Sequence, residues 1–175
     1  SVSFSSYPAT LSSVDDYYVT DTGLSIIETT NSIFNLELYK AVTPESLLYW
    51  VRVMVATRLE DNGKDWVDTF ARYNSGTYNN QWMVLDLKLF TPGKDLVPNT
   101  LWIAEQIPGK VATKDVTTVL SLGYWPSYNV PSIESIFVAS GYPAAVKQQG
   151  PQMNSYQDCV RAQIFRQRQA GVQDM

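Results

Sequence analysis

From residue 74 the chain reads Asn74-Ser75-Gly76-Thr77-Tyr78-Asn79-Asn80-Gln81-Trp82, and it continues directly into the apolar segment Met83-Val84-Leu85. Amide and turn-forming residues directly before a buried strand are unusual. Buried amides and hydroxyls cost free energy unless every donor and acceptor finds a partner. The run therefore predicts either a tightly hydrogen-bonded turn or the wall of a polar pocket.

The residues after this run alternate with a period of two, which is typical of a strand between two faces. One set points one way, Met83, Leu85, Leu87 and Leu89, and the other set points the opposite way, Trp82, Val84, Asp86 and Lys88. A partner strand is predicted over 100–107, where Pro108-Gly109 ends it. The segment 114–122 shows no clear period and stays ambiguous.

Upstream of the run, the sequence predicts two strands and two helices. The strands span Tyr17–Thr20 and Leu24–Thr30, with a hairpin turn at Thr22-Gly23. A helix over 43–59, capped by Thr43, is apolar nearly all round, which predicts burial between two layers. A second, amphipathic helix follows Asp61-Asn62-Gly63 and carries four side chains on one face, Trp66, Val67, Phe70 and Tyr73.

Downstream, helical patterns occupy 131–141 and 143–148, and an apolar pattern at 161–165 predicts a strand. Antiparallel hairpins combined with buried helices predict the α+β fold class. With 175 residues, of which 45% are hydrophobic, the chain is long enough to bury one core as a single domain.

Charge and composition exclude several classes of function. The net charge is −4 and the isoelectric point about 4.7, so the chain has no electrostatic footprint for nucleic acid. No apolar run approaches the roughly 18 to 20 residues of a transmembrane segment. The first residue is Ser1 rather than methionine, and we expect processed sequence before it.

The chain contains no histidine, which excludes a Ser-His-Asp triad, a Cys-His pair or a histidine-ligated metal within it. Cys159 is the only cysteine, so no internal disulfide or Cys-x-x-Cys metal site is formed, and we interpret it as a buried bystander thiol. We predict no metal and no cofactor. Without histidine, little titrates between about pH 5 and 8 unless a group is strongly perturbed, so we expect thermal stability to vary little between about pH 5 and 7.5.

Several motifs follow one another along the chain: Phe4-Ser5-Ser6-Tyr7-Pro8, Asp15-Asp16-Tyr17-Tyr18, Glu28-Thr29-Thr30, the run at 74–82, Glu105-Gln106-Ile107-Pro108, Tyr124-Trp125-Pro126-Ser127-Tyr128-Asn129-Val130-Pro131 and Arg161-Ala162-Gln163-Ile164-Phe165. Taken in this order, they resemble the phospholipase B-like (lamina ancestor) family of the N-terminal-nucleophile hydrolase superfamily. Members of this family are much longer than 175 residues. The chain therefore looks like an interior fragment, with residues 1–175 forming a single segment of a domain whose remainder lies outside it.

The resemblance implies a four-layer αββα sandwich, of which this chain is a part. It also implies an N-terminal nucleophile whose own α-amino group serves as the base, a design that needs no histidine. The family's nucleophilic cysteine is expected upstream of Ser1, and Cys159 does not match it. Ser1 has a hydroxyl and an amine, but residues 1–7 match an interior strand of the family, which disfavours Ser1 as the nucleophile.

The resemblance carries over three catalytic candidates. Asn129 matches an asparagine whose amide forms an oxyanion hole; the alternative is a turn asparagine before an X-Pro pair. Arg161 matches an arginine near the nucleophile, and its alternative is an ordinary salt-bridging residue. The chain departs from the family here, with Val160 in place of proline and Gln163 in place of lysine. Thr30 ends its strand, where a hydroxyl could orient the nucleophile; β-branched residues are common there in any case.

Asn79 and Asn80 are the candidates for contact with a substrate, within a buried hydrogen-bond network that forms the floor of the site. The resemblance implies a hydrolase of amide or ester bonds, with lipid acyl esters as the substrate class and the lysosome or secreted fluid as its location. The expected partners are the remaining segments of the same precursor and a lipid or amide substrate. The alternative is a catalytically silent binding or scaffolding protein that retains the fold.

Overall fold

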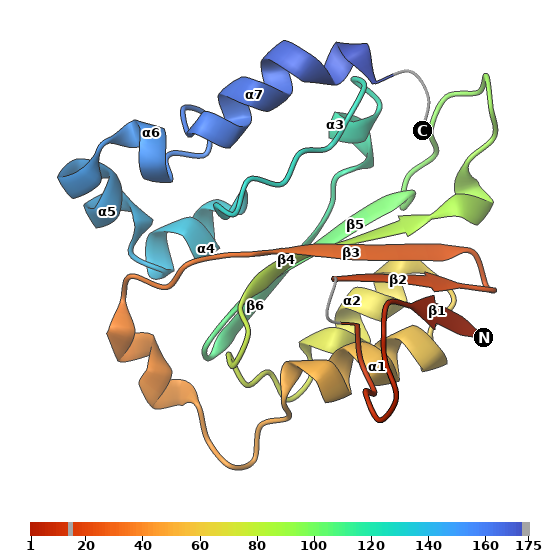
Figure 1. The fold of residues 1–175 in the computed structure, drawn as a ribbon, viewed down its shortest axis with the longest axis horizontal. Helices are drawn as coiled ribbons and strands as arrows, with labels where there is room; N and C mark the ends of the chain where they lie inside the picture. The colour runs from red at the N-terminus through yellow and green to blue at the C-terminus, as the bar shows by residue number, and fades with distance from the viewer. Residues whose placement is uncertain (14–15, 173–175) are drawn as a thin grey trace.

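The computed structural model describes residues 1–13 and 16–172, and within them the chain forms one six-stranded antiparallel sheet flanked by helices (Figure 1). The strand order follows the chain order throughout. The strands are β1 (Val2–Phe4), β2 (Tyr17–Thr20), β3 (Leu24–Thr30), β4 (Asn80–Asp86), β5 (Leu101–Ile107) and β6 (Lys110–Asp115). The α+β class is thereby confirmed. Asp15 of the acidic-aromatic motif lies outside the described residues.

The predicted hairpin of β2 and β3 is confirmed, and so is its turn. Gly23 has φ +88°, a left-handed conformation that favours glycine, and its N–H donates to the Thr20 carbonyl at 3.1 Å. The alternation predicted along β4 is correct only as far as Asp86. There the Asp86 carboxylate accepts a hydrogen bond from the Lys88 N–H at 3.0 Å and starts the 3₁₀ helix η2 (Leu87–Leu89), so Leu87 and Leu89 do not extend the strand.

Two helices, α1 (Tyr49–Leu59) and α2 (Gly63–Ala71), cover one face of the sheet (Figure 1). Between them and the strands lies an aromatic cluster in which Trp66 stacks on Phe70 at 4.9 Å between ring centroids and Trp82 lies 5.2 Å from Phe70. All three side chains are buried. The core of this face is therefore fixed by burial of large aromatic surface.

The predicted start of the first helix was wrong. Residues 43–46 form a turn, in which the Ser46 N–H donates to the Thr43 carbonyl at 3.2 Å. Leu47 then forms a parallel bridge with Asn74, and its N–H donates to the Tyr73 carbonyl at 2.8 Å. This tertiary pairing overrides the cap signal at Thr43. The helix is also not buried all round, since Leu59 is 70% exposed, and Tyr73 lies past the end of α2 and is 69% exposed.

The opposite face is covered at one end by the C-terminal third of the chain (Figure 1). Its elements are α3 (Thr117–Leu120), α4 (Glu134–Ala139), α5 (Tyr142–Gln149), α6 (Pro151–Asn154), α7 (Val160–Arg168) and η3 (Gln169–Gly171), and η1 (Leu36–Ala41) lies in the connection after β3. The ambiguous segment 114–122 contains the end of β6 and all of α3. The helices predicted at 131–141 and 143–148 are confirmed as α4 and α5, with shifted ends.

The strand predicted at 161–165 was wrong, because these residues belong to α7. The inward side chains are Cys159 and Ala162, which are spaced as on a helix and pack with Tyr128 and Tyr142. Phe165 is 39% exposed, so the apolar pattern did not mark a buried strand. Within residues 1–13 and 16–172, no helix has both the length and the apolar content needed to cross a membrane.

Candidate functional site

Three residues from distant segments meet beside the end of β3. The Asn129 amide nitrogen Nδ2 donates to the Thr30 carbonyl oxygen at 2.7 Å. Arg161, near the start of α7, donates through Nη1 to Oδ1 of the same amide. The structure thus joins Thr30, Asn129 and Arg161 in one hydrogen-bonded chain, which we call the amide cluster.

The backbone of Asn129 is left-handed, with φ 60°, as in a turn asparagine. Its carbonyl accepts from the Tyr142 hydroxyl at 3.1 Å, and that hydroxyl accepts from the Ser32 N–H at 2.9 Å. The side chain, however, bonds Thr30 and Arg161 and not its own turn. An amide nitrogen carries two hydrogens, and Thr30 is the one acceptor that the described residues supply for them. One N–H of Asn129 is therefore left for another acceptor.

Arg161 is exposed, and within the described residues it forms no ion pair with a carboxylate. Its donation to Oδ1 fixes which end of the Asn129 amide carries the hydrogens. A cation on the carbonyl oxygen also polarises the amide and strengthens its N–H groups as donors. Arg161 consequently acts on Asn129 as an orienting group.

Thr30 is half-buried and contributes both its backbone and its side chain. Its hydroxyl donates to the Tyr78 hydroxyl at 3.0 Å, while its carbonyl holds Asn129. Burial raises the pKa of Tyr78 to about 12, so this phenol stays neutral. The Thr30 side chain is therefore tied to the 74–82 run.

Asn79 and Asn80 are buried in that run. Asn79 donates to the Gly76 carbonyl at 3.0 Å and accepts the Asn31 N–H on its own carbonyl at 2.7 Å. With its amide nitrogen turned toward β3, Asn80 donates to Glu28 Oε2 at 3.1 Å and to the Asn79 carbonyl at 3.0 Å. Asn80 is directly opposite Thr30 in the β3–β4 register, and contact of Asn79 and Asn80 with a substrate stays a prediction.

The run itself is a tightly hydrogen-bonded turn that packs on the segment after β5. Asn74 donates to the Ile107 carbonyl at 2.7 Å, and Gln106 donates to the Tyr78 carbonyl. Gly76 has φ +73°, and a Cβ there would lie 2.5 Å from the Cα of Pro108. A glycine is therefore required for this close approach.

Glu28 was not singled out as a site residue from the sequence. It lies on the helix-covered face together with Leu24 and Ile26, and only 7% of it is exposed. Burial, with a smaller contribution from the Asp16 carboxyl group, raises the pKa of Glu28 to about 9. The sequence of β3 did contain a signal for its burial. Glu28 follows Leu24 and Ile26 at every second position, so it lies on the same face as these two apolar side chains.

Gln81 and Glu105 were also missed as individual residues. They are directly opposite each other in the β4–β5 register, and neither is exposed. Burial raises the pKa of Glu105, while four hydrogen-bond donors oppose that shift. Their presence in two of the polar motifs was the available signal.

A cavity of about 810 Å³ lies on the same face as Gln81 and Glu105, further along the strands. Its lining is largely apolar and includes Ile27, Met83, Leu85, Leu87, Phe90 and Leu101. Thr30, Asn129 and Arg161 do not line it. The cavity therefore offers a mainly apolar surface that is separate from the amide cluster.

The described residues hold no cluster of three or more histidine, cysteine or carboxylate side chains that could bind a metal ion. Cys159 is a free, buried thiol packed against Tyr128 and Tyr142. These apolar and aromatic surroundings fit the interpretation of a bystander thiol.

Comparison with known proteins gives a consistent result. A family profile described as Phospholipase B matches residues 1–175. Phospholipase B-like 1 of Homo sapiens is 53% identical over 173 residues, which cover 99% of this chain and 31% of the human protein. Phospholipase B-like protein G of Dictyostelium discoideum is 51% identical over 170 residues, with 94% of this chain and 28% of that protein covered. Phospholipase B of Crotalus adamanteus is 49% identical over 173 residues, with 99% and 31% covered. The chain spans less than a third of the length of these relatives.

Proposed function

The chain belongs to the phospholipase B family, and from that premise we propose that it forms part of a hydrolase that cleaves ester or amide bonds, with lipid acyl esters as the substrate class. The substrate class follows from the names of the relatives. The proposal applies to the longer protein that the relatives represent, since this chain covers about 30% of them.

The observation that carries the proposal is the amide cluster. Cleavage of an ester or amide passes through a tetrahedral oxyanion, which neutral N–H donors stabilise. Asn129 has one N–H without an acceptor among the described residues, and Arg161 holds the amide so that its nitrogen stays on that side. In this proposal Asn129 donates to the oxyanion, Arg161 orients Asn129, and Thr30 fixes the position of the amide through its carbonyl.

The nucleophile in this proposal is an N-terminal cysteine outside residues 1–175, with its own α-amino group as the base. The absence of histidine from the chain is compatible with that design. Residues 1–175 alone are then inactive, because they contain the oxyanion donor without the nucleophile. Cys159 is buried in an aromatic cluster and does not serve as the nucleophile.

We also propose that the remaining segments of the precursor complete a four-layer αββα sandwich by packing on the face of the sheet that carries Gln81. Support comes from apolar side chains exposed on that face, since Tyr17 is 40%, Val19 42% and Ile27 46% exposed. The apolar cavity of about 810 Å³ adds to the same surface. Apolar patches of this kind mark surfaces that another element covers.

A catalytically silent scaffolding protein is the competing proposal. The observation in its favour is that the amide cluster is self-contained, since Asn129 already has a partner on each end of its amide. In that case the amide of Asn129 holds α7 against β3, and its second N–H has no catalytic role. Substitution of Asn129 distinguishes the two proposals.

The test measures fatty-acid release from phosphatidylcholine vesicles by the full-length protein. Asn129→Ala is expected to lower kcat/KM by roughly a hundredfold or more, and Asn129→Asp by at least as much, because a carboxylate repels the developing negative charge. Asn99→Ala is the matched control: Asn99 also has positive φ, at 72°, and its side chain also accepts a hydrogen bond, from Trp102 at 3.0 Å. If Asn129→Ala loses only the stability that Asn99→Ala loses, Asn129 is a turn residue and the scaffold is favoured.

The proposal places the protein in the lysosome or in secreted fluid. Fractionation of cells that produce the full-length protein tests this location, and recovery in the cytosolic fraction alone would argue against it.

A further inference from the structure

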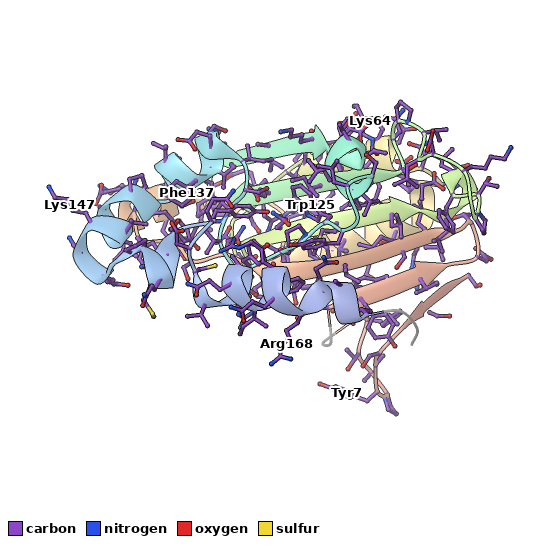
Figure 2. The ribbon with its side chains drawn as sticks, turned by 90° about the horizontal axis from the view of Figure 1, so that it is seen from above. Tyr7, Lys64, Trp125, Phe137, Lys147 and Arg168 are labelled. Carbon is purple, nitrogen blue, oxygen red and sulfur yellow. The ribbon has the colours of Figure 1, made fainter. Side chains whose placement is uncertain are left out.

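The segment that carries Asn129 crosses the sheet without regular secondary structure between α3 and α4 (Figure 1). Figure 2 looks down on this face and shows Trp125, on the same segment, over the strands. An irregular segment has no internal hydrogen-bond ladder, so its position depends on bonds to neighbouring elements. The bonds at its two ends lead to one pair of residues in the sheet.

Glu105, on β5, holds the downstream end. Its carboxylate accepts from the Ser132 N–H at 2.6 Å, the Ser132 hydroxyl at 2.9 Å and the Ile133 N–H at 3.0 Å. A further bond comes from Gln81 Nε2 at 2.5 Å. Glu105 is fully buried, and within the described residues no lysine or arginine forms an ion pair with it.

Gln81, on β4, holds the upstream end. Its Oε1 accepts from the Trp125 indole N–H at 3.1 Å, and its Nε2 donates to the Ser132 hydroxyl at 3.1 Å as well as to Glu105. Trp125 lies four residues before Asn129, and Ser132 lies three residues after it. One cross-strand pair therefore ties both sides of Asn129 to the centre of the sheet.

The cost of this arrangement indicates that it has a purpose beyond packing. The next pairs in the same register and on the same face are apolar, Met83 with Ile103 and Leu85 with Leu101. A buried carboxylate without a cation is expensive, and an apolar pair of similar volume is often at least as stable. The Gln81–Glu105 pair is thus explained by its hydrogen bonds to the segment 125–133 and not by a gain in stability from burying the two side chains.

We propose that Glu105, acting together with Gln81, is a positioning residue that clamps the segment 125–133 and so holds the Asn129 amide in its catalytic orientation. This inference rests on the function proposed above. Glu105 touches neither Asn129 nor a substrate, and it acts through the backbone of Ser132 and Ile133.

The test uses the full-length protein and the same phosphatidylcholine vesicles. Glu105→Gln keeps the shape of the side chain but turns one acceptor into a donor that faces other donors. We expect kcat to fall roughly tenfold to a hundredfold with KM changed by less than about threefold, as misplacement of a catalytic group gives. In combination with Asn129→Ala, Glu105→Gln should add almost nothing, because the group that it positions is gone.

Asp86→Asn is the matched control. Asp86 is also a buried carboxylate at 2% exposure, but it lies at the far end of β4, where Lys88 binds it at 2.8 Å. It should lower the melting temperature without lowering kcat of the folded protein. If Glu105→Gln lowers only the melting temperature, as this control does, Glu105 supports the fold only and the positioning role is overturned. The same holds if the effect of Glu105→Gln on kcat adds fully to that of Asn129→Ala.

Two further measurements keep the inference testable. Trp125→Phe removes the indole N–H that binds Gln81 while keeping an aromatic side chain, and we expect a several-fold lower kcat that is again not additive with Asn129→Ala. Hydrogen exchange, which needs no turnover, should become faster at Ser132 and Ile133 in Glu105→Gln while the amides of β4 and β5 stay protected. Unchanged exchange at these two amides would overturn the clamp. An inactive Asn129→Ala with a normal Glu105→Gln would overturn the clamp alone, whereas the reverse would overturn the oxyanion role of Asn129.

Discussion

The two faces of the sheet are filled by different chemistry. On the helix-covered face, Trp66, Phe70 and Trp82 form a continuous aromatic cluster beneath α1 and α2. On the opposite face, polar residues occupy one end, around Gln81 and Glu105, and an apolar cavity occupies the rest. The first face is closed by elements of this chain. The second keeps both hydrogen-bond donors and uncovered apolar surface, which is where we place function.

Each face also has a buried ionisable side chain that holds neighbouring segments in place. Arg52, on α1, donates to the carbonyls of Leu47 and Phe70 and to the side chains of Asn74 and Gln106. Burial lowers the pKa of Arg52 to about 10, which still leaves it charged at neutral pH. It ties the two helices to the turn at Asn74. Glu105 instead holds the irregular segment that carries Asn129. A buried side chain with several hydrogen bonds thus stabilises the fold on one face and the candidate site on the other.

Trp66→Ala gives the largest expected effect and tests the structural face. Trp66 is fully buried, stacks on Phe70, and donates from its indole to the Thr57 hydroxyl at 3.0 Å. Its truncation should lower the free energy of unfolding by roughly 3 to 5 kcal/mol, because the cavity cannot collapse fully. Urea denaturation measures this loss, and kcat of the molecules that remain folded should not change. A clear fall in kcat of the folded molecules would mean that the helix-covered face also contributes to activity.

Ile27→Asp tests whether the other face is covered in the longer protein. Ile27 is 46% exposed in this chain, and Val55, on the outer side of α1, is 42% exposed. If further segments pack on the face of Ile27, the new carboxylate is buried without a partner and should cost about 2 to 3 kcal/mol. Val55→Asp is the matched control and should change stability by less than about 0.5 kcal/mol. Equal, small effects in the full-length protein would leave that face in solvent and contradict the four-layer proposal.

Hydrophobic periodicity and turn residues predicted correctly the parts of the fold whose structure depends on neighbouring residues in the sequence. The hairpin of β2 and β3 and the strand 100–107 are confirmed on these grounds. The amphipathic face of α2 is confirmed for Trp66, Val67 and Phe70 but not for Tyr73. The start of α1 and the state of 161–165 were wrong for a common reason. A bridge from Leu47 to Asn74, and packing of Ala162 against Tyr128, are long-range contacts that a short window of sequence does not contain.

The candidate site was predictable as a set of residues but not as a geometry. Thr30, Asn129 and Arg161 came from the resemblance to a family, and the structure brings them into contact. Nothing in their spacing predicted that the amide of Asn129 bridges the other two. Glu105 and Glu28 were missed because a carboxyl group in a strand is ordinary until both its burial and its partners are known.

Glu28 leads to the last prediction, which reverses an expectation from composition. The absence of histidine predicts thermal stability that varies little between about pH 5 and 7.5. In the structure, burial and then Asp16 raise the pKa of Glu28 from 4.5 to about 9. The titratable groups that act on Glu28 or feel its charge are Asp16, Tyr18, Tyr49 and Tyr78.

Because the folded protein binds the proton of Glu28 more tightly than the unfolded chain, its contribution is fully present below about pH 4.5. It is lost as the pH rises toward 9. Stability should therefore fall from about pH 5 to 7.5, by at most about 1.4 kcal/mol per pH unit for this one group. Glu28→Gln keeps a neutral side chain at every pH and should flatten the slope. Urea denaturation of both proteins at several pH values measures the difference, which isolates Glu28 from the other groups. Parallel curves would mean that Glu28 is ionised in the folded protein, where the Asn80 amide would then donate to a buried carboxylate.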